Sequence, residues 1–182
     1  MSGAQLDFTI PTLVTERLIL RPHRLDDFEA SAALWADPGV VRFISGVPFN
    51  QEQSWSRFLR YKGSWHFLGF GFWAVEERQS GDFVGEVGFL EGRRAMTPSI
   101  QGTLETGWVL HPSVHGKGYA TEALMPVIAW GKARFPDQRM TCIIATENNA
   151  SLRVAAKLGF EEVTRTVYND SAVVLLERNG DG

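Results

Sequence analysis

Apolar residues recur along the chain at two spacings, at alternate positions and at every third or fourth position, and these spacings predict its strands and helices. In the segment 12–22, Leu18 and Leu20 occupy alternate positions, which predicts a first strand that ends at Pro22. Acidic residues then open a helix over 25–36, because carboxylates favour the positive end of the helix dipole.

The remaining elements follow from the same two spacings. Three- and four-residue spacing predicts helices, whereas alternation or a short apolar run predicts strands. We expect a loop over 93–101, where Pro98 stands in a segment without periodicity. The expected helices span 51–65, 119–135 and 147–158, and the expected strands span 70–77, 82–90, 103–110, 140–146, 161–167 and 172–177.

Two glycines, Gly116 and Gly118, stand between the strand expected at 103–110 and the helix that follows it. Glycines allow unusual backbone angles and let another molecule approach exposed N–H groups. The first turn of a helix adds unpaired N–H groups at the positive end of its dipole. The segment 102–123 therefore predicts a site for an anion such as a phosphate or pyrophosphate. A tight turn before a core helix is the structural alternative.

Two common phosphate-binding motifs do not fit this segment. A P-loop requires G-x-x-x-x-G-K-[ST], but Lys117 is followed by Gly118, and no glycine stands five positions before Gly116. A dinucleotide fingerprint G-x-G-x-x-G would need a glycine where Thr121 stands, and its turn should follow the strand directly. Here residues 111–115 intervene, so neither motif explains the glycines.

Composition narrows the class of protein. The 182 residues suffice for one domain with a substantial core, and the single cysteine, Cys142, is expected to be buried and reduced. The net charge is −3 and basic residues do not cluster, which argues against a nucleic acid or an anionic membrane as partner. No apolar run approaches the ~20 residues that cross a bilayer, and the segment 1–11 lacks a signal-peptide pattern. We therefore expect a cytoplasmic protein.

Three segments resemble those of the GNAT N-acetyltransferase superfamily. The sequence HGKGYA at 115–120 resembles its Gln/Arg-x-x-Gly-x-Gly/Ala pyrophosphate loop, with His115 in place of Gln or Arg. The sequence ENNASLRVAAKLGF at 147–160 is similar to its Asn-x-x-Ser-x-x-x-x-x-Lys-x-Gly-Phe pattern. The opening TERLILRP at 15–22 resembles the branch that includes ribosomal-protein-alanine N-acetyltransferases. The resemblance extends over 15–177.

The resemblance implies the GNAT fold, with one α/β domain over 12–178 and an N-terminal extension over 1–11. That fold has a twisted, mixed and mostly antiparallel sheet of six to seven strands, with helices on both faces. Its central strand, here 103–110, splays from the next strand, here 140–146. The splay would leave unpaired backbone groups between the two strands.

The resemblance also implies acetyl-CoA as co-substrate. Its pyrophosphate would bind backbone N–H groups of the glycine loop, and its pantetheine arm would lie as an additional strand beside Trp108, Val109 and Leu110. Asn148 and Ser151 match positions that face the cofactor in the family, although an asparagine at a helix start also serves as a cap. The loop residues expected to bind are His115, Gly116, Lys117, Gly118, Tyr119, Ala120 and Thr121.

Acetyl transfer to an amine needs a base, an oxyanion donor and a proton for the leaving thiolate. Glu105 matches the position of an acidic general base in relatives, and a solvated or salt-bridged strand residue is the alternative interpretation. A backbone N–H near Val109 would stabilise the oxyanion. Many relatives protonate the thiolate with a tyrosine where this chain has Ala155. Ser151 is the substitute, unless its hydroxyl only caps the helix.

The resemblance implies direct transfer in a ternary complex and leaves the acceptor open. A protein N-terminal α-amine is one candidate, and an amine-bearing small molecule such as an antibiotic, a polyamine or an amino acid is the other. A non-catalytic acyl-CoA-binding module is compatible with the missing tyrosine. Homodimers are frequent among relatives. We expect no metal site, since His111 and His115 lack a shared helical face and a further ligand.

Overall fold

A twisted sheet of eight strands runs through the molecule, in the order β1-β2-β3-β4-β5-β6-β8-β7. The computed structural model describes residues 9–178. All neighbouring strands are antiparallel except β5 and β6. The strands are β1 (Leu13–Val14), β2 (Leu18–Arg21), β3 (Phe72–Glu77), β4 (Phe83–Leu90), β5 (Leu104–Leu110), β6 (Met140–Ala145), β7 (Phe160–Tyr168) and β8 (Ser171–Arg178).

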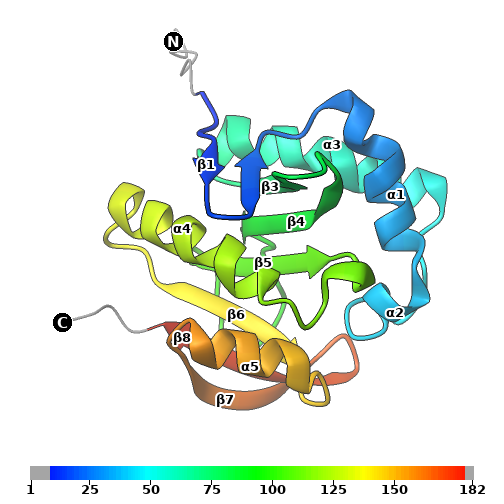
Figure 1. The fold of residues 1–182 in the computed structure, drawn as a ribbon. Coiled ribbons are helices and arrows are strands. Elements are labelled where there is room, and N and C mark those ends of the chain that lie inside the picture. The colour runs from blue at the N-terminus through cyan, green and yellow to red at the C-terminus, as the bar shows by residue number, and fades with distance from the viewer. Residues whose placement is uncertain (1–8, 179–182) are drawn as a thin grey trace, which may run out of the picture.

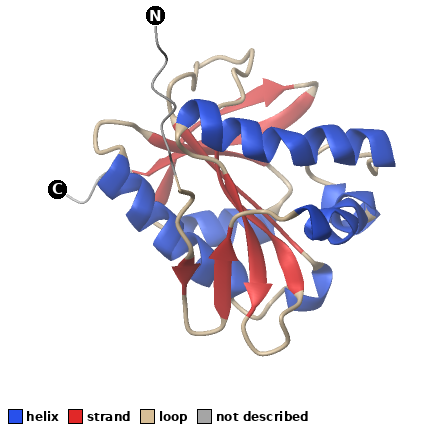
Figure 2. Ribbon diagram, turned by 90° about the horizontal axis from the view of Figure 1, so that it is seen from above, coloured by secondary structure: helices blue, strands red, loops and turns tan. Residues whose placement is uncertain are grey.

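Helices cover both faces of the sheet (Figures 1 and 2). In Figure 1, α4 and α5 lie in front of the sheet and α3 lies behind it. Within residues 9–178, no helix is long and apolar enough to span a membrane. The helices are α1 (Phe28–Ala36), α2 (Pro38–Val41), α3 (Gln51–Leu68), α4 (Tyr119–Arg134) and α5 (Asn149–Lys157), with single turns η1 (Leu25–Asp27) and η2 (Pro112–Val114).

Strand β4 shows how alternation divides the two faces. Val87 and Phe89 are fully buried in the main core, which also contains Leu124 and Val127 of α4. Glu86 points to the opposite face, where side chains of α1 and α3 reach it. The face of α4 and α5 is therefore the apolar core, and the face of α1 and α3 carries buried polar groups.

The predicted first strand is wrong in one respect, because 12–22 forms two strands instead of one. The chain reverses at Thr15, whose N–H donates to the Leu18 carbonyl at 2.9 Å and whose hydroxyl accepts from the Leu18 N–H at 3.0 Å. β1 then pairs with β2, so the sheet has eight strands instead of six to seven. Alternation along a short segment does not reveal such a turn.

The segment directly after α1 forms a second, short helix. Asp37 accepts a hydrogen bond from the Gly39 N–H at 2.7 Å, and Pro38 begins the short helix α2. Proline suits a first helical position because its missing N–H would have no partner there.

The predicted splay between the central strand and the next one is confirmed. β5 and β6 pair at only two positions, Leu104 with Met140 and Glu105 with Thr141. Beyond them the two strands separate, although each continues to Leu110 and Ala145, respectively. The facing backbone edges therefore have no partner strand over most of their length.

Candidate active site

The glycine loop after β5 adopts left-handed backbone angles, with φ of 75° at Gly116 and 80° at Gly118. No atom lies within 4 Å of the position that a Cβ would occupy at Gly116, so conformation rather than crowding favours glycine there. Gly118 is the N-cap of α4, and its carbonyl accepts the bond from Glu122 N–H at 3.0 Å. The N–H groups of residues 118–121 therefore have no partner within the helix.

Two other N–H groups of the loop are used internally. His115 N–H donates to the Pro112 carbonyl at 3.1 Å, and Lys117 N–H approaches the Val114 carbonyl at 3.4 Å. The His115 ring nitrogen Nε2 also bonds the Leu110 carbonyl at 2.9 Å, which ties the loop to the end of β5. The N–H groups left for an anion are those of Gly116 and of residues 118–121.

The two loop histidines do not share a partner. The His111 ring nitrogen Nδ1 lies 2.8 Å from the Ser113 hydroxyl, whereas His115 turns back to β5. Within residues 9–178, no three His, Cys, Asp or Glu side chains gather in a group that could hold a metal ion.

Arg17 supports the same loop from the turn between β1 and β2, and the sequence prediction did not include it. Its Nη1 donates to the Lys117 carbonyl at 3.0 Å, and its guanidinium lies 4.5 Å from the centre of the Tyr119 ring. Its Nε donates to Glu122 at 2.6 Å. Burial alone would raise the pKa of Glu122, but bonds from Thr15 and Arg17 lower it. The only signal in the sequence was the position of Arg17 in the TERLILRP opening.

A surface hollow of about 520 Å³ lies beside the loop. It brings together Gly118 from the glycine loop and Lys157 from the ENNASLRVAAKLGF segment, which lie far apart in the sequence. The lining residues are Thr15, Glu16, Gly118, Thr121, Glu122, Met125, Pro126 and Lys157. The two motifs found in the sequence therefore share one surface groove.

Backbone directions along β5 determine which groups face the splay. His111 N–H donates to the Val84 carbonyl of the β4 side at 2.8 Å, and Leu104 N–H donates to the Arg139 carbonyl of the β6 side at 2.9 Å. Because N–H directions alternate along a strand, the N–H of Val109 faces β4. Those of Trp108 and Leu110 face the splay.

Glu105 is buried, with 4% of its surface exposed, on the face of α1 and α3. Its carboxylate is held by Arg94, whose Nη2 lies 2.6 Å from Oε1 and whose Nε lies 2.7 Å from Oε2. Arg94 also lies over the ring of Tyr168, at 4.9 Å from its centre. Burial alone would lower the pKa of Arg94, but the bonds and charge of Glu105 raise it. The salt-bridged state is thus present, and a role for Glu105 as base stays a prediction.

At the start of α5, Asn148 is the capping residue. Its Oδ1 accepts from the Ser151 N–H at 3.1 Å. The partly buried Ser151 hydroxyl has no hydrogen-bond partner in the described part of the chain. Capping therefore occupies Asn148 and leaves the Ser151 hydroxyl available for other partners.

A second carboxylate, Glu86 on β4, was absent from the predicted site. It is fully buried directly across the strand pair from Val109. Its oxygens accept from the Ser31 hydroxyl at 2.5 Å, from the Trp35 indole at 3.0 Å and from the Tyr61 hydroxyl. The sequence signal was a single carboxylate in the otherwise apolar run FVGEVGFL.

Burial alone would raise the pKa of Glu86, but this pKa lies below its usual value. The charges of His23 and Arg57 and the hydrogen bond from Ser31 outweigh the burial. The His23 ring nitrogen Nε2 lies 3.5 Å from Glu86, beyond ordinary hydrogen-bond distance. Glu86 is therefore an ionised carboxylate in a buried setting.

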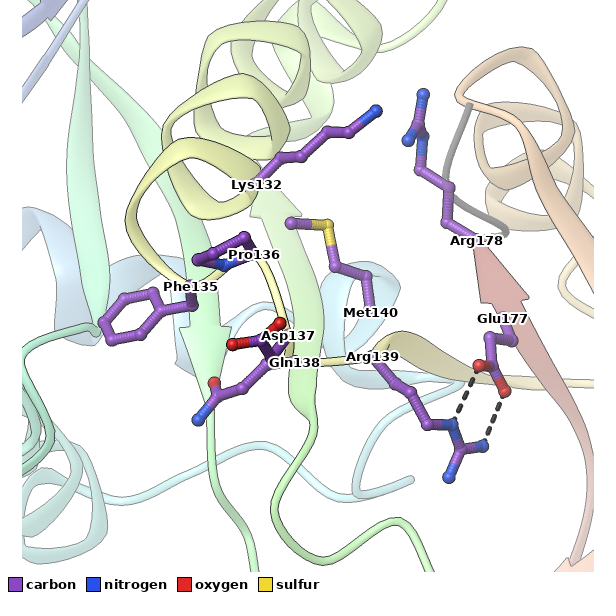
Figure 3. A pocket seen from close by; sticks show the side chains of 9 residues that line it. All are labelled: Lys132, Phe135, Pro136, Asp137, Gln138, Arg139, Met140, Glu177 and Arg178. Atoms are coloured by element: carbon purple, nitrogen blue, oxygen red, sulfur yellow. Dashed lines mark hydrogen bonds and ion pairs between the residues drawn. The ribbon is translucent and has the colours of Figure 1, made fainter. Parts of the chain in front are cut away.

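A second hollow, of about 230 Å³, lies beside the first residue of β6, at the end of the strand opposite the splay (Figure 3). Arg139 and Glu177 form an ion pair along it, with Nη2 and Oε2 2.5 Å apart. None of the predicted site residues lines this hollow, so it lies apart from the candidate active site.

Comparison with known families and sequences gives consistent matches. The model of the acetyltransferase (GNAT) domain matches residues 17–161. The uncharacterized N-acetyltransferase p20 of Bacillus licheniformis is 26% identical over 152 residues, which cover 83% of each chain. The uncharacterized N-acetyltransferase YoaA of Bacillus subtilis (strain 168) is 27% identical over 157 residues, or 84% of each chain.

Solved structures show the same architecture. An acetyltransferase of Agrobacterium tumefaciens str. C58 matches with a TM-score of 0.81 and 27% identity, over 98% of this chain and 100% of that one. RimL, a ribosomal L7/L12 α-N-protein acetyltransferase in complex with coenzyme A, matches with a TM-score of 0.72 and 18% identity, over 91% and 96%. At that identity the second match shows a shared fold.

Proposed function

The chain belongs to the acetyltransferase (GNAT) family of acetyl-CoA-dependent enzymes, and we propose that it transfers the acetyl group directly to a primary amine. The observation that carries the proposal is the splay of β5 and β6 beside the left-handed glycine loop. Coenzyme A has an amide-containing arm that ends in a pyrophosphate. Unpaired strand edges suit the amides, and free N–H groups at a helix start suit the pyrophosphate.

We assign the binding of acetyl-CoA to three groups of residues. Gly116 and residues 118–121 would hold the pyrophosphate, with His115 and Lys117 shaping the loop. Trp108 and Leu110 would pair with the arm, and Val109 would lie between them. The groove lined by Lys157 would hold the nucleotide end, since a lysine there offers a cation to phosphate.

The oxyanion donor in this proposal is the N–H of Trp108 or of Leu110. Both neighbour Val109 and face the splay, whereas the Val109 N–H faces β4. Removing one such donor typically costs about 3 kcal/mol of transition-state stabilisation.

Proton transfer completes the reaction. Acetyl-CoA supplies a thioester, whose carbonyl carbon bonds to the amine nitrogen while the bond to sulfur breaks. Glu105 accepts the proton that leaves the nitrogen, directly or through water, and Ser151 relays a proton to the sulfur. The thiol of Cys142 is buried and its pKa is raised, so it is a poor candidate for an acetylated intermediate. This supports direct transfer.

The acceptor is a protein N-terminal α-amine or an amine-bearing small molecule. RimL, which shares the fold, is a ribosomal-protein α-N-acetyltransferase. The deciding experiment follows thiol release from acetyl-CoA with a panel of N-terminal peptides and small amines. Acetyl-CoA binding without release from any of them would favour a non-catalytic acyl-CoA-binding module. Sedimentation would test the homodimer that we also expect.

The loop conformation gives a first prediction. Gly116→Ala should shift the free loop away from left-handed angles, because a Cβ disfavours them by about 1–2 kcal/mol. Acetyl-CoA binding must then restore those angles, so it should weaken by about tenfold. Gly81 is a matched control in the β3–β4 turn, with φ of 79° and open space around a Cβ. Calorimetry should show weaker binding for Gly116→Ala and unchanged binding for Gly81→Ala; equal binding would contradict the pyrophosphate assignment.

Two substitutions at the start of α5 give a second prediction, because one should affect stability and the other should affect the reaction rate. Asn148→Ala should lower the free energy of unfolding by about 1 kcal/mol through loss of the cap. Ser151→Ala should change it by less than about 0.5 kcal/mol. The rate of thiol release should nevertheless fall by about 10²-fold in Ser151→Ala, through loss of the proton relay. An unchanged rate would show that water alone protonates the thiolate.

A further inference from the structure

One arginine on the face of α1 and α3 is held firmly without a carboxylate of its own. Arg57 Nε donates to the Tyr61 hydroxyl at 3.0 Å, and its guanidinium carbon lies 3.6 Å from the centre of the Trp35 ring. The side chain is partly buried. Its guanidinium therefore lies fixed against an aromatic surface, while its two terminal nitrogens have no hydrogen-bond partner among residues 9–178.

Three other arginines of the chain show a contrasting arrangement. Arg21, Arg94 and Arg139 each contact one carboxylate through two nitrogens. Their partners are Asp27, Glu105 and Glu177, respectively. No ion pair joins Arg57 to a carboxylate in the described part of the chain.

The two side chains that hold Arg57, Tyr61 and Trp35, also contact residues of the central sheet. Tyr61 and Trp35 both donate to Oε2 of Glu86. Glu86 lies opposite Val109, and Trp35 packs in the same buried cluster as Val109. Arg57 is thus linked to β5 through Trp35, on the face opposite α4.

Glu86 does not supply the missing carboxylate. Its oxygens are occupied by Ser31, Trp35 and Tyr61, and its charge reaches Arg57 across Tyr61. One turn further along α3 lies a second cation. Desolvation and then the charge of Arg57 lower the pKa of Arg60. The surface here carries two neighbouring positive charges and a free guanidinium edge.

We propose that Arg57 binds a carboxylate carried by the amine acceptor, so that this enzyme prefers carboxylate-bearing amines. The inference rests on the proposed function, because it concerns the acceptor of the same reaction. A planar guanidinium with two free nitrogens matches a carboxylate, and stacking on Trp35 keeps it oriented. Two sources share this chemistry: the α-carboxylate of a free amino acid and an acidic side chain near a peptide N-terminus.

The test compares matched acceptors that differ only in the carboxylate. One pair is an amino acid and its amide, and the other is a peptide with aspartate or asparagine at its second position. Thiol release gives kcat/KM for the wild type, Arg57→Gln, Arg57→Lys and the neighbouring control Arg60→Gln. We expect the wild type to prefer the carboxylate in one pair by about tenfold or more, mainly through KM. Arg57→Gln should lose this ratio, Arg57→Lys should keep part of it, and Arg60→Gln, which removes a nearby charge but no stacked guanidinium, should keep most of it.

Equal kcat/KM for both members of each pair in the wild type would overturn the proposal, as would equal slowing of all acceptors in Arg57→Gln. A binding titration gives a readout that does not depend on turnover. An N-acetyl amino acid and its amide, which are products of the proposed reaction, are titrated into the wild type and into Arg57→Gln. Selective loss of carboxylate binding in Arg57→Gln supports the site. Absence of that selectivity counts against the site, whereas absence of thiol release with every acceptor counts against the proposed function.

Discussion

Replacing Glu105 by glutamine is expected to lower kcat by about 10²- to 10⁴-fold with any amine that the protein acetylates, because an amide cannot accept the proton of the amine. Thiol release at saturating acetyl-CoA and saturating amine measures this loss.

Arg94→Gln is the matched control for this variant. It breaks the same ion pair and leaves the Glu105 carboxylate in place. A rate loss confined to Glu105→Gln would assign the base to that carboxylate. Equal rate losses in the two variants would assign the effect to the ion pair, and full turnover in Glu105→Gln would leave Glu105 as a structural partner of Arg94.

Glu86→Leu is expected to lower the free energy of unfolding by about 3–5 kcal/mol, because removing one partner of a buried charged network leaves the others uncompensated. The donors left without an acceptor are the hydroxyl of Ser31, the indole of Trp35 and the hydroxyl of Tyr61. Glu86→Gln retains one acceptor oxygen and should lose only about 1–2 kcal/mol. Urea denaturation of both variants gives the values, and equal losses would contradict the network.

The same carboxylate should make stability depend on pH. The pKa of Glu86 in the folded protein lies below its usual 4.5, so its ionised form stabilises the fold above about that pH. This contribution is lost as the pH falls through the folded-state pKa. The difference in unfolding free energy between wild type and Glu86→Gln should therefore shrink below pH 4.5. A difference that stays unchanged in acid would show that folding does not lower the pKa of Glu86, and one that grows in acid would show that folding raises it.

Local motifs could be predicted from the sequence because their geometry depends on neighbouring residues. Gly116 and Gly118 have left-handed angles just before a helix, as the spacing predicts. The Asn148 side chain caps α5 three residues before Ser151. The splay followed from the family resemblance and is confirmed, although no local pattern in β5 or β6 reveals it.

The polar networks could not be predicted, because their members lie far apart in the chain. Glu86 is 55 residues from Ser31 and 51 from Trp35. Arg17 is 105 residues from Glu122. Arg94 lies in a loop without periodicity, so alternation could place Glu105 on its strand but not identify its partner.

The junction of β5 and β6 has a consequence for how the molecule opens. Two residue pairs join strands β1–β5 to strands β6–β8. The sheet therefore consists of two parts that are hydrogen-bonded to each other at one end. A bound pantetheine arm that forms hydrogen bonds with both β5 and β6 would connect the two parts of the sheet. Amide protection in β6 to β8 should then rise with coenzyme occupancy. Product release would have to break the same hydrogen bonds.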